Sequence, residues 1–182
     1  MNEFYLVKGA DAEVIQDING WNNRFRDYLR DFFAGELERV RGTRFGDNIA
    51  KIIYMTERAV MEPDTFRGVR DAQNRLQAAA IVEEEIDCLY VDALATAPWN
   101  IVGSQPETIK GAGTSLMEEL VKESLELGYM GRVRLFAIER ALSFYTGIGF
   151  IADLDESRSL ELTPDSALGF LERQRSLRRD GS

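Results

Sequence analysis

The stretch that decides the fold covers residues 94–120: it reads LATAP at 94–98, then a loop, then KGAGTSLMEEL at 110–120. A strand that ends at a proline is followed by a glycine-containing turn and a helix. The first amides of a helix lack partners within it, and the helix dipole adds about half a positive charge there. Gly111 and Gly113 would let the backbone approach a pyrophosphate. The stretch predicts either an anion site or a plain glycine turn entering a packed helix, and it is not a Walker A loop.

Hydrophobic periodicity on both sides of this stretch predicts a mixture of strands and helices, with no internal repeat and no linker. The predicted strands lie at residues 4–8, 65–72, 76–82, 86–97, 133–138, 150–155 and 157–162. The predicted helices lie at residues 14–32, 47–62, 113–127, 139–147 and from 164 onward. Residues 99–110 are expected to form an irregular loop. This mixed order of elements predicts an α/β or α+β fold.

Some helix boundaries can be predicted from single residues. The first helix is expected to break or bend near Gly20. Asp47 or Asn48 is the expected cap of the second helix, although residues 49–55 also have a strand-like pattern. Thr163, followed by a proline, is the expected cap of the C-terminal helix.

The composition is that of an acidic globular protein. Its 22 basic and 31 acidic side chains among 182 residues give a formal charge of -9. Such a field repels phosphate backbones, so we expect no nucleic-acid partner, and it favours cationic ligands. No stretch approaches the roughly 20 apolar residues needed to span a bilayer, and the N-terminus lacks the pattern of a secretory signal. We therefore expect a cytoplasmic protein with no membrane partner.

The chain has no histidine and a single cysteine, Cys88. The absence of histidine removes the usual catalytic base and the commonest zinc ligand, so we expect no metal and a base drawn from carboxylate, tyrosine, lysine, cysteine or water. One cysteine rules out an internal disulfide and fits a reducing compartment. Nothing near Cys88 in the sequence would lower its pKa, so a buried structural cysteine is a better interpretation than an acyl-enzyme nucleophile.

A second motif, FYTGIGF at residues 144–150, follows a strand that lies beyond the glycine turn. The order strand, glycine turn, helix, strand, then A-x-x-F-Y-x-x-x-G-F, resembles the GNAT superfamily of N-acetyltransferases over residues 89–150. The resemblance implies a single domain over residues 1–182, with a cofactor-binding core at about 86–150 and acceptor-side helices at about 11–60. It also implies a mixed, splayed sheet of six or seven strands with helices on both faces, plus a C-terminal helix.

The same resemblance implies that acetyl-coenzyme A (acetyl-CoA) binds between the parted central strands. The residues that would hold it are Leu94, Ala95, Thr96, Lys110, Gly111, Ala112, Gly113, Thr114 and Ser115. The family's turn reads Q/R-x-x-G-x-G/A, so Thr108 replaces the leading Gln or Arg, while Lys110 keeps a cation in the turn. Ile138 stands where the family usually has an asparagine before E-R-A. The loop at 99–108 is several residues longer than usual.

Tyr145 is the residue to which the resemblance gives the sharpest role. In the family, the matching tyrosine lies near the sulfur of coenzyme A and protonates the departing thiolate. A phenol with a pKa of about 10 is suited to that transfer. The alternative is a core aromatic residue, because Phe144 and Phe150 form an apolar cluster with it.

Strand periodicity places Cys88, Tyr90, Asp92 and Leu94 on one face. Family members, notably arylalkylamine acetyltransferases, have proton-accepting side chains at the positions of Tyr90 and Asp92. Asp92 could therefore relay a proton from the amine through water, provided that burial raises its pKa from about 3.9. A strand-edge aspartate bonded to a nearby amide is an equally open interpretation.

The sequence predicts transfer of an acetyl group from acetyl-CoA to a primary amine by direct attack. One alternative is a non-catalytic coenzyme A-binding sensor or interaction module of the same fold, and another is an enzyme that uses a longer acyl chain. The amine could belong to a small molecule or to a peptide, and a homodimer stays open. Trp21, Phe25, Tyr28 and Phe32 could line the acceptor site, or they could simply be core residues.

Overall fold

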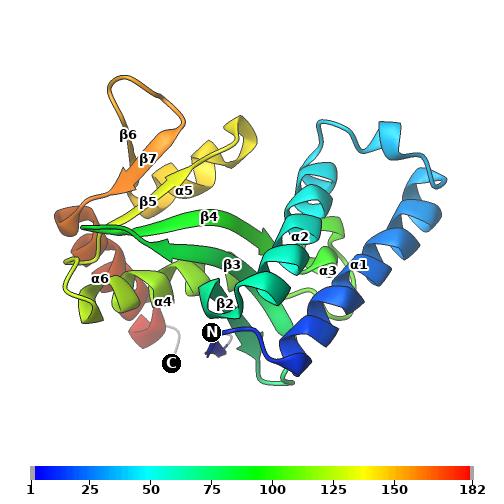
Figure 1. Cartoon of the computed structure of the whole chain (residues 1–182), viewed down its shortest axis with the longest axis horizontal. Coiled ribbons are helices and arrows are strands. Elements are labelled where there is room, and N and C mark those ends of the chain that lie inside the picture. The colour runs from blue at the N-terminus through cyan, green and yellow to red at the C-terminus, as the bar shows by residue number, and fades with distance from the viewer. Residues whose placement is uncertain (1–2, 181–182) are drawn as a thin grey trace. The chain divides into compact units, whose positions relative to one another are not determined.

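Within residues 3–180, which this computed structural model describes, seven strands form one mixed sheet in the order β1-β2-β3-β4-β5-β7-β6 (Figure 1). The described chain divides into an N-terminal unit of residues 3–81 and 93–113 and a C-terminal unit of residues 82–92 and 114–180. In chain order the elements are β1 (Phe4–Lys8), α1 (Ala12–Phe33), η1 (Leu37–Arg39), α2 (Arg44–Met61), η2 (Pro63–Thr65), β2 (Phe66–Asp71), β3 (Leu76–Glu84), β4 (Leu89–Thr96), α3 (Pro98–Val102), α4 (Ala112–Glu126), β5 (Val133–Phe136), η3 (Glu139–Ala141), α5 (Leu142–Ile148), β6 (Ile151–Ala152), β7 (Ser159–Leu162) and α6 (Pro164–Asp180).

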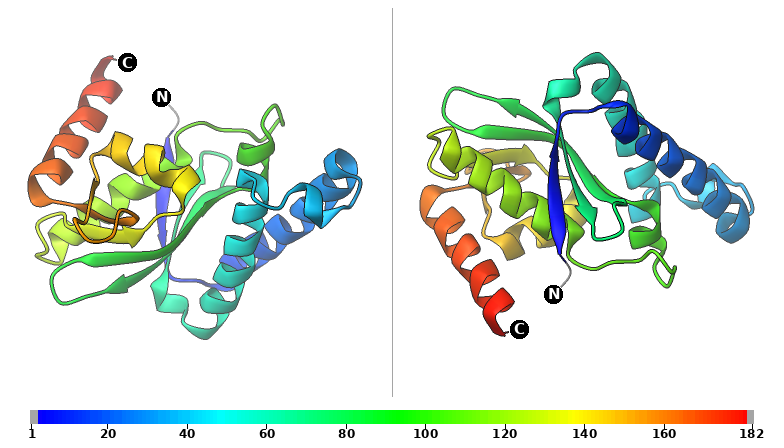
Figure 2. Two further views of the ribbon diagram at one scale, coloured as in Figure 1. Left: turned by 90° about the horizontal axis from the view of Figure 1, so that it is seen from above. Right: turned by 90° about the horizontal axis from the view of Figure 1, so that it is seen from below.

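The pairing of the strands follows from the connections between them. Strands β1, β2 and β3 pair antiparallel, and β1 lies along the edge of β2 (Figure 2). Strand β4 pairs parallel with β5, and α4 makes the crossover that a parallel pair requires. That pairing covers Leu89–Val91, although β4 itself continues to Thr96. The mixed open sheet with its C-terminal helix confirms the predicted fold class.

Helix α1 buries the apolar stripe that its sequence predicts, and it is not broken at Gly20. Val14, Ile18, Trp21 and Phe25 are all at most 3% exposed. The helix runs without interruption over Ala12–Phe33, because the stripe continues in register on both sides of the glycine. A glycine inside a helix is about 1 kcal/mol less favourable than an alanine, and packing along the stripe outweighs that cost.

Helix α2 begins earlier than predicted, since Thr43 and not Asp47 or Asn48 is its cap. The Gly46 amide donates to Thr43 Oγ1 at 3.2 Å, which satisfies one unpaired first-turn amide. Asn48 is instead buried on the stripe formed by Phe45, Ile52, Met55 and Ala59. The strand alternative for residues 49–55 is wrong.

Aromatic and aliphatic side chains from both helices form the core of the N-terminal unit. Helices α1 and α2 lie side by side (Figure 1), and Phe25 meets Phe45 edge to face at 5.0 Å between ring centroids. Phe66, Leu76 and Ile81 of the strands join the same cluster. Of the aromatic residues considered for the acceptor site, Trp21, Phe25 and Tyr28 are core residues, whereas Phe32 is 55% exposed.

The sheet of the C-terminal unit has one apolar face and one charged face. Val133 pairs with Leu162 in the buried set, while Arg134 pairs with Glu161 on the opposite face at 3.2 Å between Nε and Oε2. Helices α4 and α6 lie side by side (Figure 2), joined by an ion pair between Arg178 and the buried Glu118. Thr163 caps α6 as predicted, because its Oγ1 accepts from the Ser166 amide at 3.3 Å.

The structure differs from the predicted elements at several places. The strand predicted at 86–97 covers only Leu89–Thr96, so Cys88 lies before it. Residues 98–102 form the short helix α3, because Pro98 occupies the first helical position, where its missing amide costs nothing. The strand predicted at 150–155 shrinks to Ile151–Ala152, since the following residues form exposed turns. Among residues 3–180, no helix combines the length and the apolar character needed to cross a bilayer.

Candidate functional site

The alternation predicted for β4 is present in the structure. Leu89, Val91, Ala93 and Ala95 are buried, whereas the side chains between them are half-buried or exposed. The end of the strand is held by Asn48, whose Nδ2 donates to the Thr96 carbonyl at 2.8 Å and whose Oδ1 faces the Thr96 amide at 3.4 Å. A side chain therefore contacts both backbone groups of Thr96, which together with the backbone of Ala95 is expected to pair with the pantetheine arm of acetyl-CoA.

Gln77 occupies a β-bulge opposite this strand end. Val69 pairs with Ala78 and Arg70 pairs with Leu76, so Gln77 has no partner on β2. A bulge releases backbone groups and redirects a side chain. The freed Gln77 carbonyl accepts from the Ala97 amide at 3.0 Å, which joins the start of β3 to the end of β4.

The side chain of Gln77, which is fully buried, is the centre of a polar network. Its Oε1 accepts from Trp99 Nε1 and from Asn100 Nδ2, both at 2.9 Å. Its Nε2 donates to Asp71 Oδ2 at 2.7 Å, and the same carboxylate accepts from Arg75 Nε at 2.8 Å. Burial acts to raise the pKa of Asp71, but hydrogen bonds from the Arg75 amide and side chain, from Gln77 and from the Gln73 amide hold it below its usual value.

Asn100 extends this network to the glycine turn. Its Oδ1 accepts from the Ile109 amide at 2.8 Å, immediately before Lys110. Thr108, which replaces the family's Gln or Arg, donates its hydroxyl to the Trp99 carbonyl at 2.8 Å. The extra length of the loop therefore forms a bonded segment that leads into the turn.

The predicted glycine turn is open and leads directly into a helix. Gly111 has φ +93°, and an added Cβ would meet open space there. Helix α4 starts at the next residue and runs for 15 residues. Lys110 and Gly111 are exposed, Ala112 is buried, and Gly113, Thr114 and Ser115 are half-buried. A side chain at position 111 would face strain in the left-handed region rather than a clash.

Tyr145 is the buried member of an aromatic cluster in the C-terminal unit. It is 5% exposed and meets Phe144 and Phe150 edge to face, at 5.0 and 5.5 Å between ring centroids. Burial raises the pKa of Tyr145 to about 12. Its phenol therefore keeps its proton throughout the physiological range, and the same shift makes it a weaker acid than the free phenol on which the predicted role was based.

The two base candidates lie two positions apart on one face of β4, and their surroundings differ. Asp92 is exposed, so the burial on which its role as a base depends is not found in the described chain. Tyr90 is half-buried, and burial followed by the charge of Asp92 raises its pKa. Tyr90 can therefore relay a proton as a neutral hydroxyl but does not provide a phenolate.

Cys88 fits the structural interpretation. It is fully buried, and its thiol donates to Glu85 Oε2 at 3.2 Å. Burial and that bond raise its pKa to about 12, the opposite of what a nucleophilic thiolate needs.

Solved structures resemble this chain, although no protein-family model matches the sequence and no curated protein matches it. PaiA N-acetyltransferase from Thermoplasma acidophilum, solved with coenzyme A, aligns over 87% of this chain and 96% of its own at TM-score 0.50 and 18% identity. GCN5 from Tetrahymena aligns over 89% and 97% at 0.51 and 12%. N-acetylglutamate synthase from Neisseria gonorrhoeae aligns over 88% of this chain and 34% of its own at 0.52 and 14%.

The chain has the GNAT fold. The similarity to the GNAT fold was expected from residues 89–150. It extends to the first half of the chain, where the sequence had matched only in the order of its elements. Among the expected residues of the GNAT site, Tyr90, Asp92, Thr114, Ser115 and Tyr145 belong to the C-terminal unit. The others, from Leu94 to Thr96 and from Lys110 to Gly113, belong to the N-terminal unit.

Sequence reasoning missed the polar residues that hold the GNAT strand end and turn. Gln77 lies in the run LQAAAIV, which predicts only a strand, and Asn100 lies in a segment predicted to be irregular. Asn48 is one of the two residues that the sequence offers as a helix cap. Its one available signal was a polar residue at core spacing between Phe45 and Ile52.

Proposed function

We propose that this chain is an N-acetyltransferase that transfers an acetyl group from acetyl-CoA to a primary amine by direct attack. The observation that carries the proposal is the GNAT fold, whose helix α4 begins directly after the open turn at Gly111. GNAT structures such as PaiA and N-acetylglutamate synthase were solved with coenzyme A. Among residues 3–180, no group of three or more potential metal ligands gathers, and the reaction we propose uses none.

The residues of the turn suit a pyrophosphate. Lys110 brings a cation, and Gly111 leaves room beside the backbone. The first amides of α4, a helix of 15 residues, point out of its N-terminus toward the turn. Thr108 takes no direct part, because its hydroxyl is bonded within the loop. Acetyl-CoA supplies an activated thioester, and Lys110, Gly111, Ala112, Gly113, Thr114 and Ser115 would hold its phosphates.

Proton transfers are assigned to three residues. Tyr145 donates its phenolic proton to the departing thiolate, because burial keeps that phenol neutral. Asp92 and Tyr90 form the path by which the proton of the amine leaves, and Asp92 accepts that proton through water. In the alternative route, the amine loses its proton to solvent before it attacks. The exposure of Asp92 favours the second route for amines of ordinary basicity.

A non-catalytic coenzyme A-binding module is the second candidate, and one observation favours it. Asp92 is exposed, so the described part of β4 lacks the buried base on which the expected catalytic role of Asp92 depends. Such a module would bind acetyl-CoA and leave it intact.

The test combines binding with turnover. Wild-type protein should bind acetyl-CoA by calorimetry and release coenzyme A in the presence of a panel of small amines and peptides. Gly113→Val should abolish binding while circular dichroism shows an intact fold. Binding without turnover across the panel would leave the sensor alternative, whereas no binding by the folded wild type would rule out both.

The base is tested by the dependence of kcat/KM on pH. If the acidic limb of the pH profile vanishes in Asp92→Asn, together with most of the activity, Asp92 is the base that accepts the proton of the amine. If the limb instead follows the pKa of the amine supplied and survives the substitution, the amine loses its proton to solvent.

A further inference from the structure

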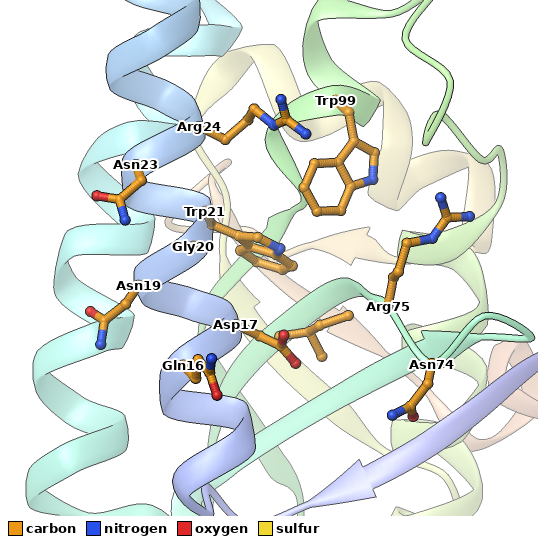
Figure 3. A pocket seen from close by; sticks show the side chains of 11 residues that line it. Gln16, Asp17, Asn19, Gly20, Trp21, Asn23, Arg24, Asn74, Arg75 and Trp99 are labelled. Carbon is orange, nitrogen blue, oxygen red and sulfur yellow. The ribbon is translucent and has the colours of Figure 1, made fainter.

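A cavity in the N-terminal unit has no role in the proposed reaction. It has a volume of about 560 Å³ and lies between α1, the β2–β3 turn and Trp99 (Figure 3). Ligand sites have volumes of about 300–1,000 Å³, so the cavity can hold a small metabolite. None of the residues expected to contact acetyl-CoA lines it.

The apolar part of this cavity consists of two indoles. Trp21 and Trp99 meet edge to face at 6.5 Å between ring centroids, and both line the cavity together with Leu76. Trp21 is 2% exposed, and the Nε1 of Trp99 is bonded to Gln77, so both rings are fixed. Preformed aromatic walls of this kind favour a ligand with a large apolar group.

The polar part presents charges of both signs. Arg24 and Arg75 line the cavity with Asp17, which extends from α1 into the space that Arg75 borders (Figure 3). Their side chains are 42%, 34% and 32% exposed, so solvent and ligands can reach them.

Each of these charges is already balanced by a partner. Arg24 pairs with Glu107 at 2.8 Å, Arg75 with Asp71 at 2.7 Å, and Asp17 with Arg70 at 2.6 Å. A purely anionic ligand would face Asp17, and a purely cationic one would face two guanidinium groups. A ligand that carries one charge of each sign avoids both repulsions, and guanidinium groups keep further N–H donors for a carboxylate.

The local electrostatics of Asp17 agree with a cationic group on the ligand. Burial raises the pKa of Asp17, and the charge of Arg70 offsets only part of that effect. Its carboxylate therefore lacks part of the stabilisation that water would give it, and a ligand ammonium group would supply it.

Gly20 leaves part of the cavity wall without a side chain. It lies inside α1, where glycine is less favourable than alanine, and it lines the cavity. A Cβ built there meets nothing within 4 Å, so no packing contact requires glycine. A larger side chain at this position would project into the cavity.

We infer that this cavity is a binding site for a zwitterionic amino acid with a large apolar side chain. The ammonium group meets Asp17, the carboxylate meets Arg24 and Arg75, and the side chain lies against Trp21 and Trp99. The inference does not depend on acetyl transfer. Trp99 and Glu107 belong to the segment that leads to the glycine turn, so a bound ligand would also contact that segment.

Intrinsic fluorescence tests the site directly, because the chain has two tryptophans and both line the cavity. The probes are L-phenylalanine, phenethylamine, 3-phenylpropionate and glucose, and L-leucine is a second amino acid. The expected result is a saturable change with the amino acids at or below about 10 mM, and at least about tenfold weaker binding of each analogue that lacks one charge.

Variants separate this site from binding elsewhere. Gly20→Leu should abolish the fluorescence change, and Asp17→Asn should weaken amino acid binding about tenfold while 3-phenylpropionate binds as well as before or better. Asp27→Asn is the matched control, because Asp27 lies on the same helix and pairs with Arg30 at 3.3 Å outside the cavity. Circular dichroism and the melting temperature show whether each variant is folded.

Three results would overturn the inference. The first is no response of the folded wild type to either amino acid. The second is equal or tighter binding of phenethylamine, 3-phenylpropionate or glucose. The third is unchanged amino acid binding in folded Asp17→Asn, which tests the site even if Gly20→Leu does not fold.

Discussion

The two units differ in where they keep their polar groups. In the N-terminal unit, Gln77 and Asp71 are 0% and 2% exposed, and their bonds join the β2–β3 turn to the segment after β4. In the C-terminal unit, Arg134 pairs with Glu161 and Asp87 on the open face of the sheet, and these side chains are 38%, 31% and 46% exposed. The centre of the first network is buried, whereas the second network is exposed to water.

This difference teaches which contacts the fold cannot lose. A buried polar group that loses its partner bears the full cost of its desolvation, about 1–3 kcal/mol per group. An exposed ion pair is replaced by water, and pairs of this kind stabilise a protein by about 0–1 kcal/mol. The unit that holds the recognisable tyrosine motif should therefore tolerate loss of its surface charges, while the other unit should not tolerate loss of Gln77.

The largest effect is expected for Gln77→Leu. The substitution keeps the volume but leaves Asp71, Trp99 and Asn100 without their bonds to Gln77, so the free energy of unfolding should fall by about 3–5 kcal/mol. Urea unfolding followed by circular dichroism measures the change. A loss below about 1 kcal/mol would show that the buried network is no more important than the exposed one.

The next effect is on catalysis and belongs to the other unit. Tyr145→Phe should reduce kcat about 10²-fold, which equals about 2.7 kcal/mol, with little change in KM for acetyl-CoA. Because the pKa of Tyr145 is raised to about 12, its proton stays available as pH rises, and any alkaline decline of kcat below pH ~10 should persist in the variant. An unchanged kcat would leave Tyr145 as a packing residue.

A smaller effect is expected where the buried network meets the turn. Asn100→Ala removes the acceptor of the Ile109 amide, so the affinity for acetyl-CoA should fall about tenfold, or about 1.4 kcal/mol, with kcat at saturation nearly unchanged. Asn22→Ala is the control, since it removes one side-chain bond, to Thr56, between α1 and α2. Equal affinities of the two variants for acetyl-CoA would show that the buried network does not contribute to cofactor binding.

The smallest effect is expected on the exposed face. Arg134→Gln should change the free energy of unfolding by no more than about 1 kcal/mol, because Arg132 still pairs with both Asp87 and Glu161. The difference in the free energy of unfolding between the variant and the wild type should shrink further at salt concentrations of about 0.5 M or above. A loss comparable to that of Gln77→Leu would remove the contrast between the two networks.

Local patterns predicted the elements well wherever one side-chain period dominated. The stripe of α1, the alternation of β4 and the Thr163 cap are all present. The errors came where short-range signals competed, as at Gly20, where packing outweighed glycine's helix cost, and at Thr43, which took the cap assigned to Asp47 or Asn48.

The candidate site divides in the same way. Tyr145, Gly111 and Lys110 were found from motifs whose members are close in sequence, and their roles stay predictions. Asn48, Gln77 and Asn100 were missed because each bonds a residue far along the chain, from Asn48 to Thr96 and from Gln77 to Asn100. A polar residue in an apolar run does not say which partner it will meet.

The sequence by itself predicted most of the elements and the turn that opens α4, because these depend on periodicity and on neighbouring residues, whereas the GNAT fold was predicted from the family resemblance of residues 89–150. Only the tertiary structure decided that Gln77 lies in a bulge, that Asn48 faces the end of β4, and that Asp92 is exposed while Tyr145 is buried. It also decided that Asp17, Arg24 and Arg75 line one cavity with both tryptophans. Burial and pairing between distant residues are properties of the packed chain, and they set the pKa values and hydrogen bonds on which chemistry depends.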